Sequence, residues 1–311
     1  MSPLKLSIVI CTHNRANLLM HTIASLNTAL RPDNCDLSIL VIANACRDET
    51  SQELKNYIRQ QKTSDVITLQ YREEPRPGKS HALNLAIKKI KDGYLCFVDD
   101  DHRVDSNYLR AITEAIRNKP TCPLFCGRII PDWTGEEPAW VHITGHFRIY
   151  PLPVPHFELG NEPAVLDEDQ SIPGGGNLIA HTSLFQRIGG FNIKLGPKGH
   201  NLLGSEDSDF VLRALAAKEE LRYEPDIVQY HYVDIERLQL RYLLQKSFQR
   251  TRSITLARNP EHSHTPRYLW RKLFDYSRQG LLSFSRTKAR FYMMRVAATL
   301  GEIAGYWGHT K

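Results

Sequence analysis

Apolar runs alternate with helical patterns along the first third of the chain. Four short apolar runs predict strands at residues 6–11, 37–42, 66–71 and 94–98. The spacing between them predicts helices at residues 16–30, 52–61 and 80–90, and Asp48 is a suitable cap for the second of these. This alternation predicts an α/β fold with a mostly parallel central sheet, which binds its ligands beyond the carboxyl ends of the strands.

Three polar segments directly follow predicted strands. They are residues 12–15, 44–48 and 99–101. Because the carboxyl ends of parallel strands meet at one edge of a sheet, all three are expected to lie close together. The sequence therefore predicts a ligand site at this edge.

The pattern changes after residue 131. Seven of the 17 prolines and two tryptophans, Trp133 and Trp140, lie between residues 131 and 173, where periodicity is weak. We expect a long, partly mobile loop over a site, in which the two tryptophans either stack on a sugar or pack in a core. Helical spacing returns at residues 183–188 and 207–217, and amphipathic helices are predicted at residues 238–256 and 268–307.

Charge divides the chain into a mildly acidic body and a basic C-terminal region. Residues 237–311 carry 15 Lys and Arg against 3 Asp and Glu, a net charge of +12, whereas the preceding residues carry 25 against 31, a net charge of −6. We therefore predict two domains, residues 1–236 with the sheet and residues 237–311 as a basic helical extension. The basic helices suit an anionic membrane surface, packing on the first domain, or a homodimer interface.

The sequence disfavours a membrane-spanning location and a nucleic-acid partner. No run approaches the roughly 18 apolar residues of a membrane-spanning helix, so we expect a cytoplasmic protein, with peripheral attachment to the inner face of the membrane as the alternative. Nucleic acid is not an expected partner, because the basic residues share helices with Leu and Phe and do not line an aromatic sheet face.

The run Asp99, Asp100 and Asp101 is the sharpest chemical feature. Like charges about 4 Å apart repel by about 4 kcal/mol at an effective dielectric constant near 20, and a hard divalent cation removes that cost. An aspartate run can also simply begin the next helix. Its position directly after a buried strand at the binding edge favours a metal site.

Further candidates lie in the second half of the chain. Glu206 and Asp207 precede an apolar helix. In the structural reading, Ser205 or Asp207 is the N-cap and the acids favour the helix start, whereas in the functional reading one of the acids is a general base. His231 follows a strand-like run, where a histidine is either structural or a metal ligand. The glycines before Asn177, at residues 174–176, indicate a backbone that passes very close to another group, such as a sugar, or a flexible turn.

In this order, these segments resemble the family 2 glycosyltransferases, which have the GT-A fold. The resemblance covers roughly residues 4–231. Its motifs are Ser-Ile-Val-Ile-Cys-Thr-His-Asn-Arg at 7–15, Gly-Lys-Ser-His-Ala-Leu-Asn at 78–84, Phe-Val-Asp-Asp-Asp at 97–101, Gly-Gly-Gly-Asn at 174–177, Ile-Gly-Gly-Phe at 188–191 and Glu-Asp at 206–207. The ordered set is more specific than any one of them.

The resemblance implies roles for particular residues. Asp101 would coordinate Mg²⁺ or Mn²⁺, with His231 completing the site, and Asp207 would be the catalytic base, with Glu206 orienting it or replacing it. The residues expected to bind the nucleotide sugar are Thr12, Asn14, Arg15, Asn44, Lys79, Asp99, Asp100, Gly175 and Asn177. Many relatives carry an acidic residue where this chain has Ala43, so the nucleobase contacts are less well defined, and UDP is the favoured donor nucleotide.

The expected activity is the inverting transfer of a sugar from a nucleotide sugar to a hydroxyl group of a saccharide or lipid-linked acceptor, as in the synthesis of surface polysaccharide or glycolipid. A retaining transferase of the same fold is an alternative. A sugar nucleotidyltransferase is another, although residues 13–17 lack its glycine-rich signature. A non-catalytic scaffold that binds through the basic region is a third, and the intact Asp101, Asp207 and His231 argue against it.

Overall fold

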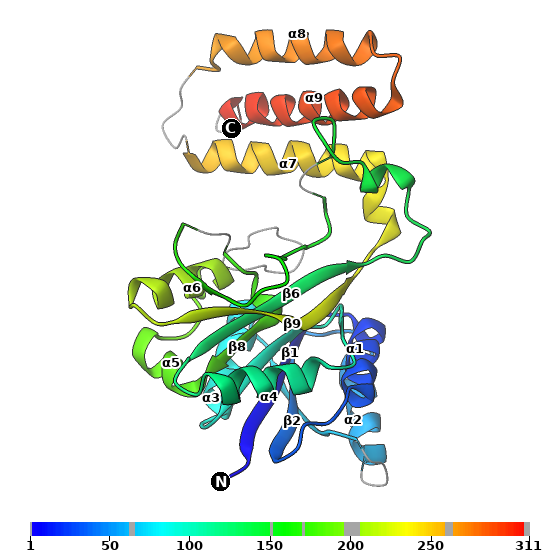
Figure 1. Ribbon diagram of the computed structural model, residues 1–311. Helices are drawn as coiled ribbons and strands as arrows, with labels where there is room; N and C mark the ends of the chain where they lie inside the picture. Colours follow the sequence, from blue (N-terminus) through cyan, green and yellow to red (C-terminus); the bar gives the residue numbers. More distant parts are fainter. Residues whose placement is uncertain are drawn as a thin grey trace. The chain divides into compact units, whose positions relative to one another are not determined.

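Figure 1 shows a computed structural model of the chain, which describes residues 2–61, 66–149, 152–169, 172–195, 206–258 and 264–307. The chain divides into two compact units. The first comprises Met1–Asp132 and Pro155–Tyr232, and the second comprises Trp133–Val154 and Val233–Lys311. The boundary near residue 232 lies close to the predicted one, but the sequence did not assign Trp133–Val154 to the C-terminal unit.

The described strands of the first unit form one sheet. They are β1 (Leu4–Thr12), β2 (Cys35–Asn44), β3 (Thr68–Glu74), β4 (Tyr94–Asp99), β5 (His102–Val104), β6 (Leu124–Asp132), β7 (Ala164–Leu166), β8 (Leu178–His181) and β9 (Leu221–Tyr232). The order is β3-β2-β1-β4-β8-β6-β9-β5, with β7 paired to β9. The four strands β3-β2-β1-β4 are parallel, as predicted, and the sheet is mixed beyond β4 because β8, β5 and β7 pair in the antiparallel sense.

Helices cover both faces of this sheet. Those of the first unit are α1 (Ala16–Thr28), α2 (Thr50–Gln60), α3 (Lys79–Lys89), α4 (Tyr108–Asn118), α5 (Thr182–Ile188) and α6 (Glu206–Ala216), with a short 3-10 helix, η3 (Gly175–Asn177). Side chains of α1, α2 and α4 share one buried cluster with the sheet, and side chains of α3, α5 and α6 share the other. The fold class predicted from the sequence, an α/β sheet flanked by helices with a helical C-terminal extension, is confirmed.

The alternation of β1 shows why this arrangement forms. Ile8 and Ile10 enter the cluster beneath α1 and α4, while Val9 between them enters the opposite cluster. Successive side chains of a strand point to opposite faces, so a continuous apolar run fits a strand that is covered on both sides. Each such side chain contributes about 1.5–3 kcal/mol when it is fully buried.

Asp48 holds the beginning of α2 differently from the predicted cap. Its Oδ1 atom accepts hydrogen bonds from the backbone N–H (3.2 Å) and hydroxyl (2.6 Å) of Thr50, the first residue of the helix. Its Oδ2 atom accepts one from the backbone N–H of Ala16 at the start of α1, 3.2 Å away. One carboxylate therefore joins the starts of two helices at the carboxyl edge of the sheet. The cap predicted from Ser205 lies outside the described residues.

The second unit contains α7 (Leu240–Arg258), α8 (Arg267–Leu281) and α9 (Arg286–Trp307), with the 3-10 helices η2 (Ala139–His142) and η4 (Ile235–Leu238). Helix α9 packs against both α7 and α8. A side-chain carbon at Gly301 would collide with the carbonyl oxygen of Phe248 and the hydroxyl of Thr251, so the glycine permits the close approach of α9 to α7. None of the described helices is long and apolar enough to cross a membrane.

Two predictions for this part of the chain were wrong. The helix predicted at residues 268–307 is broken between α8 and α9, after Leu281. Residues 131–173 are not one loop, because they contain η2, β7 and the end of β6. Val141 and Val154 from this stretch are buried in a cluster with Val233 and Leu238, against which Trp133 and Trp140 also pack. The packing alternative for the two tryptophans is therefore the one that the structure supports.

Candidate active site

The three polar segments meet at the carboxyl edge of the parallel strands, as predicted. Thr12 pairs in register with Ala43, and Cys11 pairs with Asp99. The loop after β1 is tied to the loop after β2, since the backbone N–H of Arg47 donates to Asn14 Oδ1 at 2.7 Å. Asn14 has a φ of 54°, a left-handed conformation that asparagine tolerates better than most residues. The parallel topology thus brings residues from distant parts of the sequence to one edge.

Asp99 forms an ion pair with Lys79 from the first turn of α3, with Asp99 Oδ1 2.6 Å from Lys79 Nζ. Burial alone would raise the pKa of Asp99, but the Lys79 ammonium group lowers it overall, below its ordinary value. The same pair holds the pKa of Lys79 above its ordinary value despite burial. Both groups are therefore charged at neutral pH, and Lys79 provides a fixed positive charge in the site.

Arg15 joins the other two carboxylates of the aspartate run. Its Nη1 atom lies 3.0 Å from Asp100 Oδ1 and 2.7 Å from Asp101 Oδ2. Burial, followed by the neighbouring charge of Asp101, raises the pKa of Asp100 to about 6, against the opposing effect of Arg15. The repulsion expected among the three aspartates is thus partly offset by protein cations.

Asp101, His102 and His231 form a cluster that could hold a metal ion, with one potential ligand atom from each lying within 4.8 Å of the others. Asp101 Oδ1 is 3.9 Å from His102 Nε2, and Asp101 Oδ2 is 3.6 Å from His231 Nε2. The antiparallel pairing of β5 with β9 brings the histidines together, because His102 lies opposite His231. The sequence predicted Asp101 and His231 as ligands and missed His102.

The hydrogen bonds of both histidines suit metal ligation. His102 Nδ1 lies 2.5 Å from Gln229 Oε1, and His231 Nδ1 lies 2.6 Å from the carbonyl oxygen of Tyr232. Because both partners are acceptors, each Nδ1 carries a proton, and in the neutral form of each ring the Nε2 atom would offer a lone pair on the side of Asp101. His102 Nε2 is buried without a hydrogen-bond partner among the described residues. One carboxylate and two imidazoles select Mn²⁺ or Mg²⁺ less strongly than a set of oxygen ligands does, but they can bind a divalent cation.

A buried network of polar side chains holds His102 in this arrangement. Gln229 is completely buried, and its Nε2 lies 3.1 Å from the carbonyl of Phe97, 2.6 Å from Tyr108 Oη and 2.9 Å from Asn177 Oδ1. The Asn177 Nδ2 atom donates to two backbone carbonyls, and its Oδ1 also accepts from Tyr108. All donor and acceptor positions of the Asn177 amide are therefore used within this network, and its predicted contact with the nucleotide sugar stays a prediction.

Asn44 is similarly engaged in the framework. Its Nδ2 atom donates to the carbonyls of Glu74 (3.2 Å) and Arg76 (2.7 Å), and its Oδ1 accepts from the backbone N–H of Gly78 at 2.8 Å. The side chain thus fastens the end of β2 to the turn that precedes Lys79. These hydrogen bonds account for the burial of the Asn44 side chain without any contact to a ligand. Thr12 is buried beside it at the end of β1.

Two of the three glycines, Gly175 and Gly176, approach protein groups more closely than any other residue could. A side-chain carbon at Gly176 would lie 2.7 Å from Asp99 Oδ2 and 2.8 Å from His102 Cε1, and one at Gly175 would lie 2.8 Å from Asp207 Cβ. Gly175 also donates its backbone N–H to Asp207 Oδ2 at 2.6 Å. The predicted close approach is confirmed, but its described partners are the side chains of the site.

Glu206 and Asp207 begin α6 next to this glycine segment. Glu206 is buried, which raises its pKa, and Lys79 opposes that shift. Asp207 is half-buried, and its Oδ1 accepts from the backbone N–H of Ser208 at 2.8 Å. Both acids line one small cavity with Lys79 and Asp99. The structure therefore brings the predicted base candidates together with the predicted donor-binding residues.

A Rossmann-like sheet with an aspartate run, a lysine and two histidines at its carboxyl edge is the arrangement of a GT-A domain. The model of glycosyl transferase family 2 matches residues 7–166, just over half of the chain. The chain belongs to this family. No curated protein sequence matches it.

Solved structures show the same fold at low sequence identity. The mannosyltransferase PcManGT from Pyrobaculum calidifontis, in complex with GDP-Man and Mn²⁺, is 14% identical with a TM-score of 0.60, over 99% of this chain and 88% of that one. TarS residues 1–349 from S. aureus, in complex with UDP-GlcNAc, is 15% identical with a TM-score of 0.56, over 98% and 91%. Against the longer S. aureus TarS structure, the identity is 16% and the TM-score 0.54, over 91% of this chain but 44% of that one, so the chain spans less than half of it.

Proposed function

We propose that the protein is a metal-dependent, inverting glycosyltransferase that moves a sugar from a nucleoside diphosphate sugar to a hydroxyl group of its acceptor. The observation that carries this proposal is the cluster of Asp101, His102 and His231 beside the Lys79–Asp99 ion pair, at the edge of a family 2 domain. Membership of the family supports the reaction class, and the cluster supports the need for a divalent cation.

The charged residues suit a diphosphate. Asp101, His102 and His231 would hold Mg²⁺ or Mn²⁺, which when bound neutralises negative charge on a leaving diphosphate. Arg15 and Lys79 add two fixed cations near the aspartates. Asp99 and Asp100 remain the candidates for contact with the ribose and the donor sugar. The buried side of the site is already filled by the Gln229 network, so the ligand approaches the carboxylates from the edge of the sheet.

Asp207 is our proposed catalytic base. Its hydrogen bonds to the backbone N–H groups of Gly175 and Ser208 fix the carboxylate in one orientation and still leave acceptor capacity on its oxygens. It would take the proton of the acceptor hydroxyl as that oxygen attacks the anomeric carbon from the face opposite the departing nucleotide, which gives inversion. Glu206 would attract the Lys79 ammonium group and would orient Asp207 or replace it as the base.

Paired variants test this assignment. Asp207→Asn can retain the hydrogen bond from Gly175 but cannot accept a proton, so we expect at least a 100-fold loss of turnover with little change in donor affinity. Glu206→Gln is the matched variant and is expected to lose less. Turnover and donor affinity are measured by product formation and by calorimetry. A larger loss in Glu206→Gln would exchange the two roles.

The donor and acceptor need a direct screen. One neighbour was solved with UDP-GlcNAc and another with GDP-Man, and we propose UDP as the donor nucleotide of this protein. Radiolabelled UDP-, GDP- and dTDP-sugars, each with Mn²⁺, with Mg²⁺ and with EDTA, would identify the donor by hydrolysis or transfer. Full activity in EDTA would contradict the metal requirement, and a product that keeps the donor's anomeric configuration would show a retaining reaction.

The acceptor that we propose is a saccharide or lipid-linked hydroxyl compound of surface polysaccharide or glycolipid synthesis. Its support is the family and the basic second unit. Peripheral attachment to an anionic membrane surface and homodimer formation stay predictions.

A further inference from the structure

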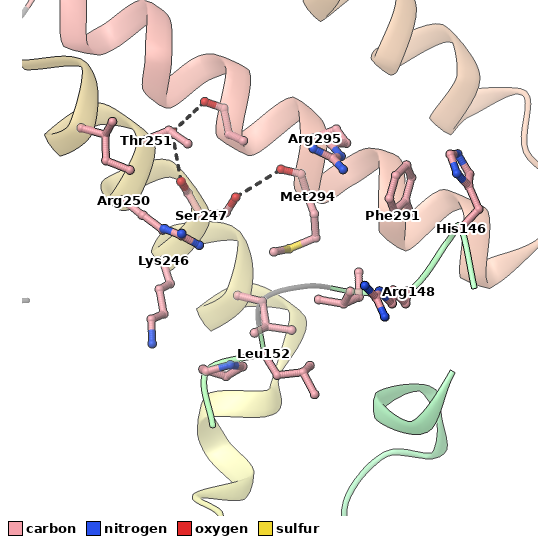
Figure 2. A pocket seen from close by; sticks show the side chains of 15 residues that line it. His146, Arg148, Leu152, Lys246, Ser247, Arg250, Thr251, Phe291, Met294 and Arg295 are labelled. Carbon is pink, nitrogen blue, oxygen red and sulfur yellow. Dashed lines mark hydrogen bonds between the residues drawn. The ribbon is translucent and has the colours of Figure 1, made fainter. Parts of the chain in front are cut away.

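The second unit contains a cavity of about 730 Å³. Its walls come from α7, α9 and residues 146–149 and 152–153, as Figure 2 shows. Ligand pockets typically measure about 300–1,000 Å³, so the space is large enough for an organic ligand. None of the residues that we assign to catalysis lines it.

The charged side chains of the wall are basic. They are Arg148, Lys246, Arg250 and Arg295, and His146 also lines the wall. Among the described residues, the lining includes no carboxylate, and no carboxylate forms an ion pair with Lys246, Arg250 or Arg295. Burial, and after it the positive charges of Arg237 and Arg250, lower the pKa of Lys246. Lys246, Arg250 and Arg295 therefore line the wall without a described carboxylate as counter-charge.

The hydroxyl groups of the wall are already used. Ser247 donates to the carbonyl of Met294 at 3.3 Å, and Thr251 donates to the carbonyl of Ala298 at 2.7 Å, so these bonds join α7 to α9. The rest of the lining includes aliphatic and aromatic side chains, among them Leu152, Phe291 and Met294. The cavity thus combines positive charge with an apolar surface.

That combination selects a class of ligand. A free saccharide would need many hydrogen-bond partners for its hydroxyl groups, which the apolar wall does not provide. A hydrocarbon chain needs none, and burying it in such a wall is favourable. Arginine and lysine bind phosphate oxygens through charge-assisted hydrogen bonds.

We propose that this cavity binds an anionic amphiphile, with a phosphate-bearing head group held by Lys246, Arg250 and Arg295 and a hydrocarbon chain packed against Phe291 and Met294. The proposal concerns binding by the second unit. It holds or fails independently of the transfer reaction proposed for the first unit.

Calorimetric titration of the full chain with n-decyl phosphate, below its micelle concentration, tests the proposal. Inorganic phosphate supplies the charge without the chain, and n-decyl maltoside supplies the chain with a neutral head group. We expect n-decyl phosphate to bind at least tenfold more tightly than either. Equal affinity for inorganic phosphate would indicate a simple anion site, equal affinity for the maltoside would indicate nonspecific apolar binding, and absence of binding would reject the site. Each of these results overturns the proposal.

Variants locate the binding. The double variant Lys246→Gln/Arg250→Gln should weaken n-decyl phosphate at least tenfold, and Arg295→Gln should weaken it separately. Arg241→Gln is the matched control, because Arg241 is an exposed basic residue of α7 that does not line the cavity. Thermal midpoints of all variants report on folding. Unchanged affinity in both cavity variants, or an equal loss in Arg241→Gln, would place the binding elsewhere and overturn the proposal.

Discussion

Replacing His102 with alanine tests the metal centre most directly, because this histidine is the member of the cluster that the sequence did not reveal. Its Nε2 atom is 3.9 Å from Asp101 Oδ1 and has no described hydrogen-bond partner, whereas its Nδ1 is held by Gln229. If Nε2 ligates Mn²⁺, the variant loses one of three protein ligands. A purely structural histidine would affect stability and leave metal affinity unchanged.

The expected size of each effect follows from the contacts. Mutating a group that merely supports a metal ligand typically lowers metal affinity about 10–100-fold. We therefore expect His102→Ala to weaken Mn²⁺ binding at least tenfold, about 1.4 kcal/mol. The same change leaves Gln229 Oε1 buried without the hydrogen bond from His102, which costs about 1–3 kcal/mol of unfolding free energy. Stability and metal affinity must consequently be measured separately.

Tyr108→Phe is the matched control. Tyr108 is fully buried, and its hydroxyl lies 2.6 Å from Gln229 Nε2 and 3.1 Å from Asn177 Oδ1. Removing this hydroxyl damages the same hydrogen-bond network without removing a metal ligand. We expect both variants to lose unfolding free energy and only His102→Ala to lose substantial Mn²⁺ affinity. Denaturant unfolding measures the first quantity, and electron paramagnetic resonance of free Mn²⁺ measures the second. Equal Mn²⁺ affinities in the two variants would refute the assignment of His102 as a ligand.

Two glycines give further predictions about close packing. Gly176→Ala should cost about 1–3 kcal/mol of unfolding free energy and lower donor affinity, since its new methyl group would lie 2.7 Å from a carboxylate oxygen of the site. Gly174→Ala is the control, because the nearest atom to its methyl group would lie 3.8 Å away. Thermal unfolding and donor calorimetry measure both variants. Equal effects of the two would contradict the packing argument. Gly301→Val should separate α9 from α7 and lower the thermal midpoint, whereas Gly280→Ala, which meets only a side-chain carbon at 3.4 Å, should be tolerated. An unchanged midpoint for Gly301→Val would contradict that close approach.

The first half of the fold could be predicted because its signals are local. The strands β1, β2 and β4 are apolar runs, β3 begins inside the run predicted at residues 66–71, and the helices between them have regular spacing. Parallel topology then places the ends of β1, β2 and β4 at one edge, without any knowledge of side-chain contacts. The strands β6 and β8 escaped prediction. β8 has only four residues directly after the glycine segment, and β6 runs into Pro131 near its end, so neither has a long periodic signal.

The site residues that the sequence analysis missed depend on strand pairing between distant parts of the chain. His102 belongs to a three-residue strand, and it meets Gln229 and His231 only because β5 pairs with β9 more than a hundred residues later. Similarly, three consecutive glycines indicate a close approach but do not say to what. Their partners, Asp99, His102 and Asp207, come from three separate elements. Such information lies in the tertiary pairing and not in any segment alone.

The aspartate run shows how the structure changes an electrostatic argument made from sequence. Adjacent carboxylates were expected to need a cation, and the protein itself supplies two, with Lys79 bound to Asp99 and Arg15 bound to Asp100 and Asp101. Repulsion therefore no longer requires a metal ion for the cluster to form. What still points to a metal is the pair of imidazole Nε2 atoms beside Asp101, one of them buried without a described partner. Because the protein's own cations balance part of the charge, the metal ion that we propose would fit a role in binding substrate phosphate more closely than a role in holding the fold together.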